Sequence, residues 1–153
     1  MKNILTLLAI SLLLVGFATA QVKTTQTEEK KNSLTIGILQ GGGALIGADF
    51  EFLVSDKIGL QIGGGLVAYG AGLNYHLKPS VGSSFLSLQY WHQGVNETHT
   101  QTLVGANYCY RGKKWFSCQI GFGFPLEKGV AWPDDIDHPS FMLTYAIGRY
   151  FTL

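Results

Sequence analysis

Two carboxylates, Asp49 and Glu51, lie two residues apart in a segment where polar and apolar residues alternate. In an extended strand such residues share one face and lie about 6.5–7 Å apart, as a catalytic pair of carboxylates could. A buried position requires partners for both charges, and His76 and Arg111 are suitable ones. We therefore expect Asp49 and Glu51 to join a structural polar network, and we predict no catalytic residue.

Residues that bind metals or activate nucleophiles gather in the second half of the chain. They are His92, His99, Asp134, Asp135, Asp137, His138 and Ser140. The histidines and aspartates could form a metal site, and His92, an aspartate and Ser140 could form a hydrolytic triad. Their spacing matches no signature of either site. We therefore expect polar loop residues, and we predict no metal ligand and no cofactor.

The two cysteines, Cys109 and Cys118, flank a basic turn at residues 111–114. A disulfide between neighbouring strands would suit an oxidising compartment. Strict alternation places the two side chains on opposite faces of a sheet, which argues against a bond unless a bulge shifts the register. The sequence leaves the pairing open.

The elements that carry these residues are predicted to be strands, because apolar and polar residues alternate from Ser33 onward and helical periodicity is absent. Eight such runs cover residues 33–40, 45–54, 58–66, 68–77, 84–93, 98–110, 115–124 and 141–153. Gln40–Gly43 closes the first run, and 125–140 is a long loop. The third run passes through Gly63–Gly65 into the fourth, and a tight glycine turn is expected to join these two runs. The pattern predicts an all-β fold, an eight-stranded antiparallel up-and-down transmembrane β-barrel.

The two faces of the predicted strands indicate which one lies inside. One face is apolar, and the other carries small or neutral polar residues. The interior is expected to hold a polar network of Asp49, Glu51, Gln61, Asn74, His76, Gln89, Gln101, Asn107 and Gln119. A polar face bathed in water should be rich in Lys and Glu, and this one is not. The pattern is typical of a membrane barrel whose narrow lumen is filled by its own side chains.

Aromatic residues near the ends of the runs are expected to anchor the barrel at the two membrane interfaces. The predicted anchors are Trp91, Trp115, Tyr110 and Phe151. Arg149 falls on the apolar face, where a charge is costly at the middle of a bilayer. Near the interface that cost approaches zero, and we expect Arg149 to reach the lipid headgroups.

The first 32 residues differ from the rest. Lys2, the apolar run Ile4–Phe17 and the small residues Ala18–Ala20 predict a signal peptide at residues 1–20, since a helix of about 21 Å is too short to span a bilayer. Residues 21–32 form a polar arm, and residues 33–153 suffice for one domain. Charged residues make up only 14% of the chain, against about 25% in soluble domains. Ten basic residues without Lys2 balance ten acidic ones, so no partnership with nucleic acid is expected.

The last six residues, 148–153 (GRYFTL), fit the glycine-x-x-apolar-x-apolar ending of outer-membrane barrels, with Leu153 where Phe or Trp is more usual. Residues 33–153 resemble the small porin-like outer-membrane β-barrel proteins of Bacteroidetes, most clearly over residues 121–151. The resemblance implies recognition of the last strand by the barrel-assembly machinery. It implies no shared chemistry.

These features predict export to the outer membrane, with the lipid bilayer and lipopolysaccharide as surroundings. We expect a structural or interaction protein with surface loops, neither an enzyme nor a wide pore. Two alternatives stay open. One is an outer-membrane lipid-modifying enzyme, and the other is a soluble periplasmic ligand carrier with a lipocalin-like barrel.

Overall fold

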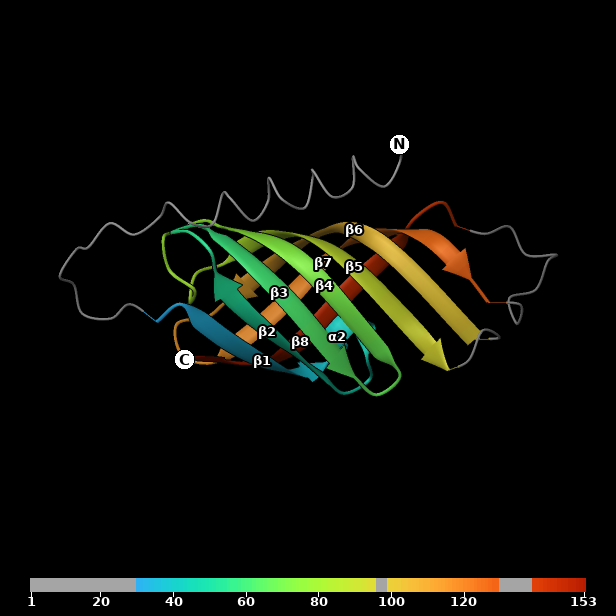
Figure 1. The fold of residues 1–153 in the computed structure, drawn as a ribbon, viewed down its shortest axis with the longest axis horizontal. Coiled ribbons are helices and arrows are strands. Elements are labelled where there is room, and N and C mark those ends of the chain that lie inside the picture. The colour runs from blue at the N-terminus through green and yellow to red at the C-terminus, as the bar shows by residue number, and fades with distance from the viewer. Residues whose placement is uncertain (1–29, 96–98, 130–138) are drawn as a thin grey trace, which may run out of the picture.

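The computed structural model describes residues 30–95, 99–129 and 139–153, so the predicted signal peptide lies outside the described residues. The strands are β1 Asn32–Ile38, β2 Gly47–Leu53, β3 Ile58–Gly65, β4 Ala68–His76, β5 Phe85–Val95, β6 His99–Arg111, β7 Phe116–Lys128 and β8 Met142–Thr152. Each strand pairs antiparallel with the next, and β8 pairs with β1 to close a barrel (Figure 1). The predicted eight-stranded antiparallel barrel is confirmed as a fold. No helix in these ranges is long and apolar enough to cross a membrane.

Alternation along the strands sorts side chains between the inside and the outside of the barrel. On β5, Ser87 and Gln89 are buried, whereas Leu86 and Leu88 are more than half exposed, at 53% and 58%. The register then brings inward residues of neighbouring strands together, because residues opposite each other share a face. Glu51, for example, lies opposite Ser33 on one side and Gln61 on the other. The core of this protein is therefore the polar interior of the barrel.

The connection between β1 and β2 folds into the barrel, where only a turn was predicted. Its residues Gln40–Gly43, labelled α2 and called the plug below, are all buried, and Figure 1 shows them within the ring of strands. The backbone angle φ is +66° at Gly41 and +80° at Gly42, a region that suits glycine. A Cβ atom added to Gly63 on the facing wall would lie 2.8 Å from the Cα of Gly41. Glycines on both sides thus make room for the plug.

The turn between β3 and β4 is tight, as predicted, but its residues differ from the prediction. Gly63–Gly65 belong to β3, and the chain reverses at Leu66 and Val67, where Val67 has a φ of +57°. Gly63 and Gly65 pack closely against other segments: a Cβ atom on Gly65 would lie 2.4 Å from the carbonyl oxygen of Ile46. Close packing, and not the turn, therefore requires these two glycines, whereas a Cβ atom on Gly64 would have its nearest neighbour at 3.9 Å.

β7 is longer than predicted, because it continues through Pro125 to Lys128. The register between β6 and β7 shifts between Thr102 and Leu103, so that Leu103 pairs with Pro125 and Thr102 with Glu127. Leu126 is the extra residue of a β-bulge. Proline has no N–H to donate to the ladder, and it is tolerated here because the bulge interrupts the ladder of hydrogen bonds. The predicted loop thus begins four residues later than expected, and the other strand ends shift by a few residues.

Candidate functional site

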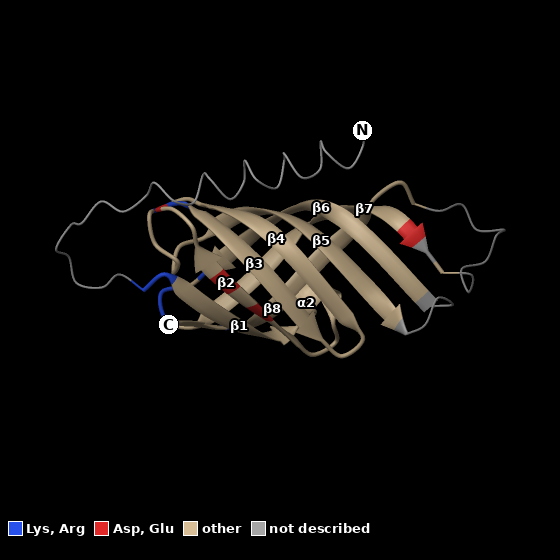
Figure 2. Cartoon of the chain, viewed as in Figure 1, with Lys and Arg blue, Asp and Glu red and all other residues tan. Residues whose placement is uncertain are grey.

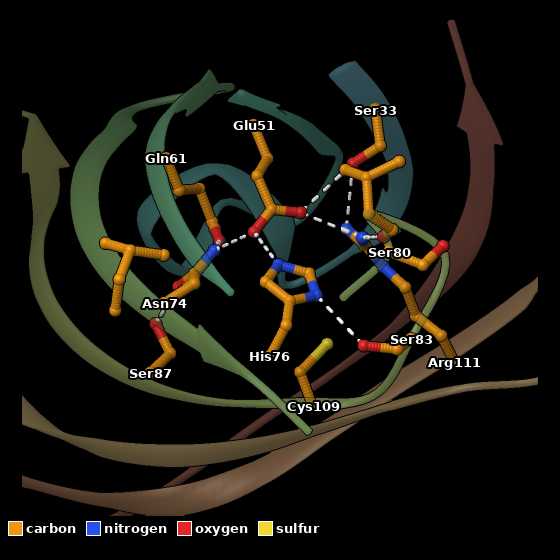
Figure 3. A network of polar contacts seen from close by, with 12 residues as sticks. Ser33, Glu51, Gln61, Asn74, His76, Ser80, Ser83, Ser87, Cys109 and Arg111 are labelled. Carbon is orange, nitrogen blue, oxygen red and sulfur yellow. Dashed lines mark hydrogen bonds and ion pairs between the residues drawn. The ribbon is translucent and has the colours of Figure 1, made fainter. Parts of the chain in front are cut away.

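Glu51 is the centre of a polar network inside the barrel (Figure 3), and only 1% of its surface is exposed. Its Oε2 atom lies 2.8 Å from Nη1 of Arg111 and accepts a 3.2 Å hydrogen bond from the Ser33 hydroxyl. Its Oε1 atom lies 2.9 Å from Nε2 of His76 and accepts a 2.5 Å hydrogen bond from Nδ2 of Asn74. Four donors therefore surround one buried carboxylate.

Arg111, the last residue of β6, ties this network to the end of the barrel where β1 begins and β8 ends, called the terminal end below. Nη1 donates to the carbonyl oxygen of Val81, a residue of the turn between β4 and β5 that is only 1% exposed. The guanidinium carbon lies 4.8 Å from the ring centre of Phe85 and 5.1 Å from that of Tyr150. These contacts fix the cation in place beside Glu51 and close the lumen at this end.

Asp49 has other partners, although the sequence placed it in the same network as Glu51. Its Oδ2 atom accepts a 3.0 Å hydrogen bond from the backbone N–H of Gly41, inside the plug. The carboxylate is buried, at 7% exposure. One carboxylate therefore holds the plug, and the other holds the ion pair with Arg111.

A second hydrogen-bonded group lies around Gln89 on β5. Its Oε1 atom accepts from Nε1 of Trp91 at 2.8 Å, from Nε2 of Gln119 at 3.0 Å and from Nδ2 of Asn107 at 3.1 Å. Oδ1 of Asn107 in turn accepts from the Thr144 hydroxyl at 2.5 Å. These contacts link β5, β6, β7 and β8 across the lumen.

The remaining predicted lumen residues are half-buried. Oε1 of Gln61 accepts a 3.0 Å hydrogen bond from Nδ2 of Asn74, and Nε2 of Gln101 points at the sulfur of Met142. The predicted set of lumen residues did not include Ser33 of β1 or Thr144 of β8, although both are buried inside the barrel. Alternation along the strands places such small hydroxyl residues on the inward face.

Trp91 lies inside the barrel, so its prediction as an interfacial anchor is wrong. Its side chain is 7% exposed and donates to Gln89, two residues away on the same strand and face. Strict alternation from Gln89 already indicated this position, but the closeness of Trp91 to the strand end suggested an anchor. The other three predicted aromatics point outward near the terminal end: Tyr110 is 45%, Trp115 49% and Phe151 39% exposed.

The interior of the barrel contains a small recess beside the plug and the ion pair. This recess of about 10 Å³ lies among residues that include Gln40, Asp49 and Arg111, which is room for one water molecule. Among the described residues, Nε2 of Gln40 and Nε of Arg111 are buried without a hydrogen-bond partner. Both residues line this recess.

The cysteines are both free. Cys109 is buried inside, and Cys118 is half-buried and lies opposite Tyr110 in the neighbouring strand. The two thiols therefore sit on opposite faces, as strict alternation predicts. The bulge between β6 and β7 lies at Thr102, too far along the strands to change this register.

His92 faces outward and belongs to a polar cluster near the end of the barrel opposite the terminal end. Its Nδ1 lies 2.9 Å from Oγ1 of Thr102, and that hydroxyl donates to Oε2 of Glu127 at 3.2 Å. Thr102 is only 1% exposed, so a substrate has no access to its hydroxyl. No contact joins His92 to Ser140 within the described ranges.

The other residues of the predicted metal site or triad, Asp134, Asp135, Asp137 and His138, lie outside the described residues. Within the described parts of the chain, no group of three or more His, Cys, Asp or Glu side chains could hold a metal ion.

Comparisons of the chain with protein-family models, with curated proteins and with solved structures found no match. The function is therefore inferred from the barrel itself. Two of its properties are informative, namely the chemistry of the outward surface and the filling of the interior.

Proposed function

We propose that the chain is a membrane-spanning barrel of a Gram-negative outer membrane, with a filled lumen and a structural or interaction role. The apolar outward surface carries this proposal. Exposed large side chains occur on every strand, for example Ile36 at 45%, Ile62 at 59%, Ile120 at 57% and Leu143 at 64%. A soluble monomer rarely exposes a contiguous apolar patch larger than about 300–600 Å².

The distribution of charge supports the same proposal. Figure 2 shows Lys and Arg gathered at the terminal end. Apart from Arg149 and Glu127, near opposite ends of the barrel, the outward faces of the strands carry no charged side chain among those described. Asp49 and Glu51 are on β2 but point inward. Hydrocarbon excludes charges more strongly the deeper they lie. A charge-free apolar belt with charges beyond it therefore matches a bilayer.

The connections indicate an orientation. The connections at the terminal end comprise residues 54–57, 77–84 and 112–115. The opposite end has two short connections, 66–67 and 96–98, but also the longest of the barrel, 129–141. Long loops face the exterior in barrels of this kind, so the opposite end would face lipopolysaccharide and the exterior. β8 closes the barrel against β1, which fits the proposal that the assembly machinery recognises this last strand.

The interior argues against a ligand carrier and against a wide pore. Binding pockets for small molecules have volumes of about 300–1,000 Å³, whereas the interior recess is about 10 Å³. The plug and the side chains around Gln89 fill the lumen from within, as expected for eight strands. The enzyme alternative gains no support from His92, because its hydroxyl partner Thr102 is buried.

Membrane fractionation followed by a heat-modifiability gel tests the proposal. The full chain is expected in the outer-membrane fraction and should migrate differently before and after boiling, because a folded barrel resists detergent. Planar bilayers containing the protein should show no wide-pore conductance. Recovery in the soluble fraction, with the same mobility before and after boiling, would refute the membrane proposal.

A further inference from the structure

We propose that a basic recess at the terminal end binds the phosphate of an anionic phospholipid, while the acyl chains lie along the adjoining barrel wall. The recess has a volume of about 370 Å³ and is lined by Lys113, Lys114, Trp115, Arg149, Tyr150, Phe151 and Thr152. It lies where the β6–β7 turn meets the last residues of β8. This inference rests on the proposed membrane function.

Arg149 is held so that its cation faces outward. Its guanidinium carbon lies 5.8 Å from the ring centre of Trp115 and 5.0 Å from that of Phe151. The turn beside it is fixed as well, because the Tyr150 backbone N–H donates to the carbonyl oxygen of Trp115 at 2.8 Å and the Tyr150 hydroxyl donates to that of Gly112 at 2.5 Å. Arginine so oriented can donate two parallel hydrogen bonds to a phosphate.

No acidic side chain of the described residues lines the recess. Among the described residues, Lys113, Lys114 and Arg149 form no ion pair. Asp56 lies in the turn between β2 and β3, and Asp49 and Glu51 point into the lumen. Three cations in a recess that no described acidic side chain lines attract an anion to this edge of the barrel.

The surroundings of Arg149 favour an anionic ligand that also has a large apolar part. Across the neighbouring strands Arg149 lies opposite Ile36 of β1 and Phe116 of β7. Further along β8 the outward residues Ile147 and Tyr145 are 48% and 57% exposed. An acidic peptide or a polysaccharide would leave this apolar surface uncovered. A phospholipid covers it with its acyl chains while its phosphate reaches the three cations.

A second basic recess at the same end provides a matched control. It is lined by Lys30, Lys31 and Lys57 and also by Asp56, and it contains no aromatic side chain. Lys30 is kept in the control variant because its Nζ donates to the carbonyl oxygen of Thr152, in the lining of the proposed site, at 2.9 Å. Removing Lys31, Lys57 and Lys78 of the neighbouring turn lowers the net charge of the rim as much as removing the three cations of the proposed site. In contrast to this second recess, the proposed site is lined by aromatic rings beside its three cations and by no described acidic side chain.

The test measures the association of spin-labelled phosphatidylglycerol, relative to spin-labelled phosphatidylcholine, with the full chain in phosphatidylcholine vesicles. The protein should prefer phosphatidylglycerol. The variant Lys113→Gln/Lys114→Gln/Arg149→Gln should lose at least about tenfold of that preference, since each cation near an anionic headgroup contributes about fivefold. The control variant Lys31→Gln/Lys57→Gln/Lys78→Gln should keep most of it.

Equal preference in the wild type and the first variant, or an equal loss in the control variant, would overturn the lipid site. Displacement of the labelled lipid by soluble polyglutamate would identify an acidic polypeptide as the occupant and would also overturn it. The heat-modifiability gel is run on the same vesicles. A wild-type protein that fails to insert would overturn the proposed function as well, whereas insertion without lipid preference would overturn only the site.

Discussion

Replacing Glu51 with Gln is expected to destabilise the barrel by about 3–5 kcal/mol, the cost of removing one partner of a buried ion pair. Glu51 is 1% exposed and accepts from four donors, two on each carboxylate oxygen. The amide of Gln keeps the shape but turns one acceptor into a donor. Either Arg111 and Ser33 or His76 and Asn74 then face another donor. In both cases the Arg111 charge loses its counter-ion.

The assay is urea unfolding of the full chain in lipid vesicles, with the folded fraction read from heat-modifiability gels. Asp56→Asn, in an exposed turn, is the control and should change the free energy of unfolding by less than about 0.5 kcal/mol. The double variant Glu51→Gln/Arg111→Met should recover part of the loss, because the buried guanidinium that lost its counter-ion is removed as well. A loss below about 1 kcal/mol for Glu51→Gln, the size of one ordinary hydrogen bond, would refute the role assigned to this network.

The plug and the cysteines give two further predictions. Gly63→Ala should destabilise the barrel by about 1–3 kcal/mol in the same urea assay, because its Cβ would lie 2.0 Å from Oδ1 of Asp49 and 2.8 Å from the Cα of Gly41. Gly64→Ala, whose Cβ would have its nearest neighbour at 3.9 Å, is the matched control, and equal effects of the two would contradict the placement of the plug. Cys118 should react with a membrane-permeable maleimide in the folded protein while Cys109 reacts only after unfolding, as mass spectrometry of the labelled chain would show. Equal labelling of both thiols, or a disulfide in a non-reducing gel, would contradict their placement on opposite faces.

The fold and much of the interior were predictable from the sequence, because a period of two determines which face each residue joins. Alternation alone places Asp49, Glu51, Asn74 and His76 on one face. It does not say which of them touch, since that depends on the register between strands. The separation of Asp49 from the Arg111 ion pair therefore appeared only in the structure.

Two features lay beyond this kind of prediction. The glycines of the plug indicate a turn, but whether that turn folds into the lumen depends on space left by Gly63 and Gly70 on other strands. The contact between Thr102 and Glu127 depends on the bulge at Leu126, and a bulge has no reliable sequence signal when proline and apolar residues surround it. Both features arise from packing between distant segments.

Spin labels introduced one at a time at positions 86 to 90 of β5 test the central claim most directly. Labels at Leu86, Leu88 and Tyr90 should show high accessibility to oxygen, which concentrates in the bilayer, because these side chains point outward. Labels at Ser87 and Gln89 should be shielded from oxygen and from a water-soluble nickel reagent, because both positions lie in the filled lumen. That two-residue alternation is the result we predict. Accessibility of the outward positions to the nickel reagent instead of oxygen would show that water covers the apolar wall, and would contradict the membrane barrel.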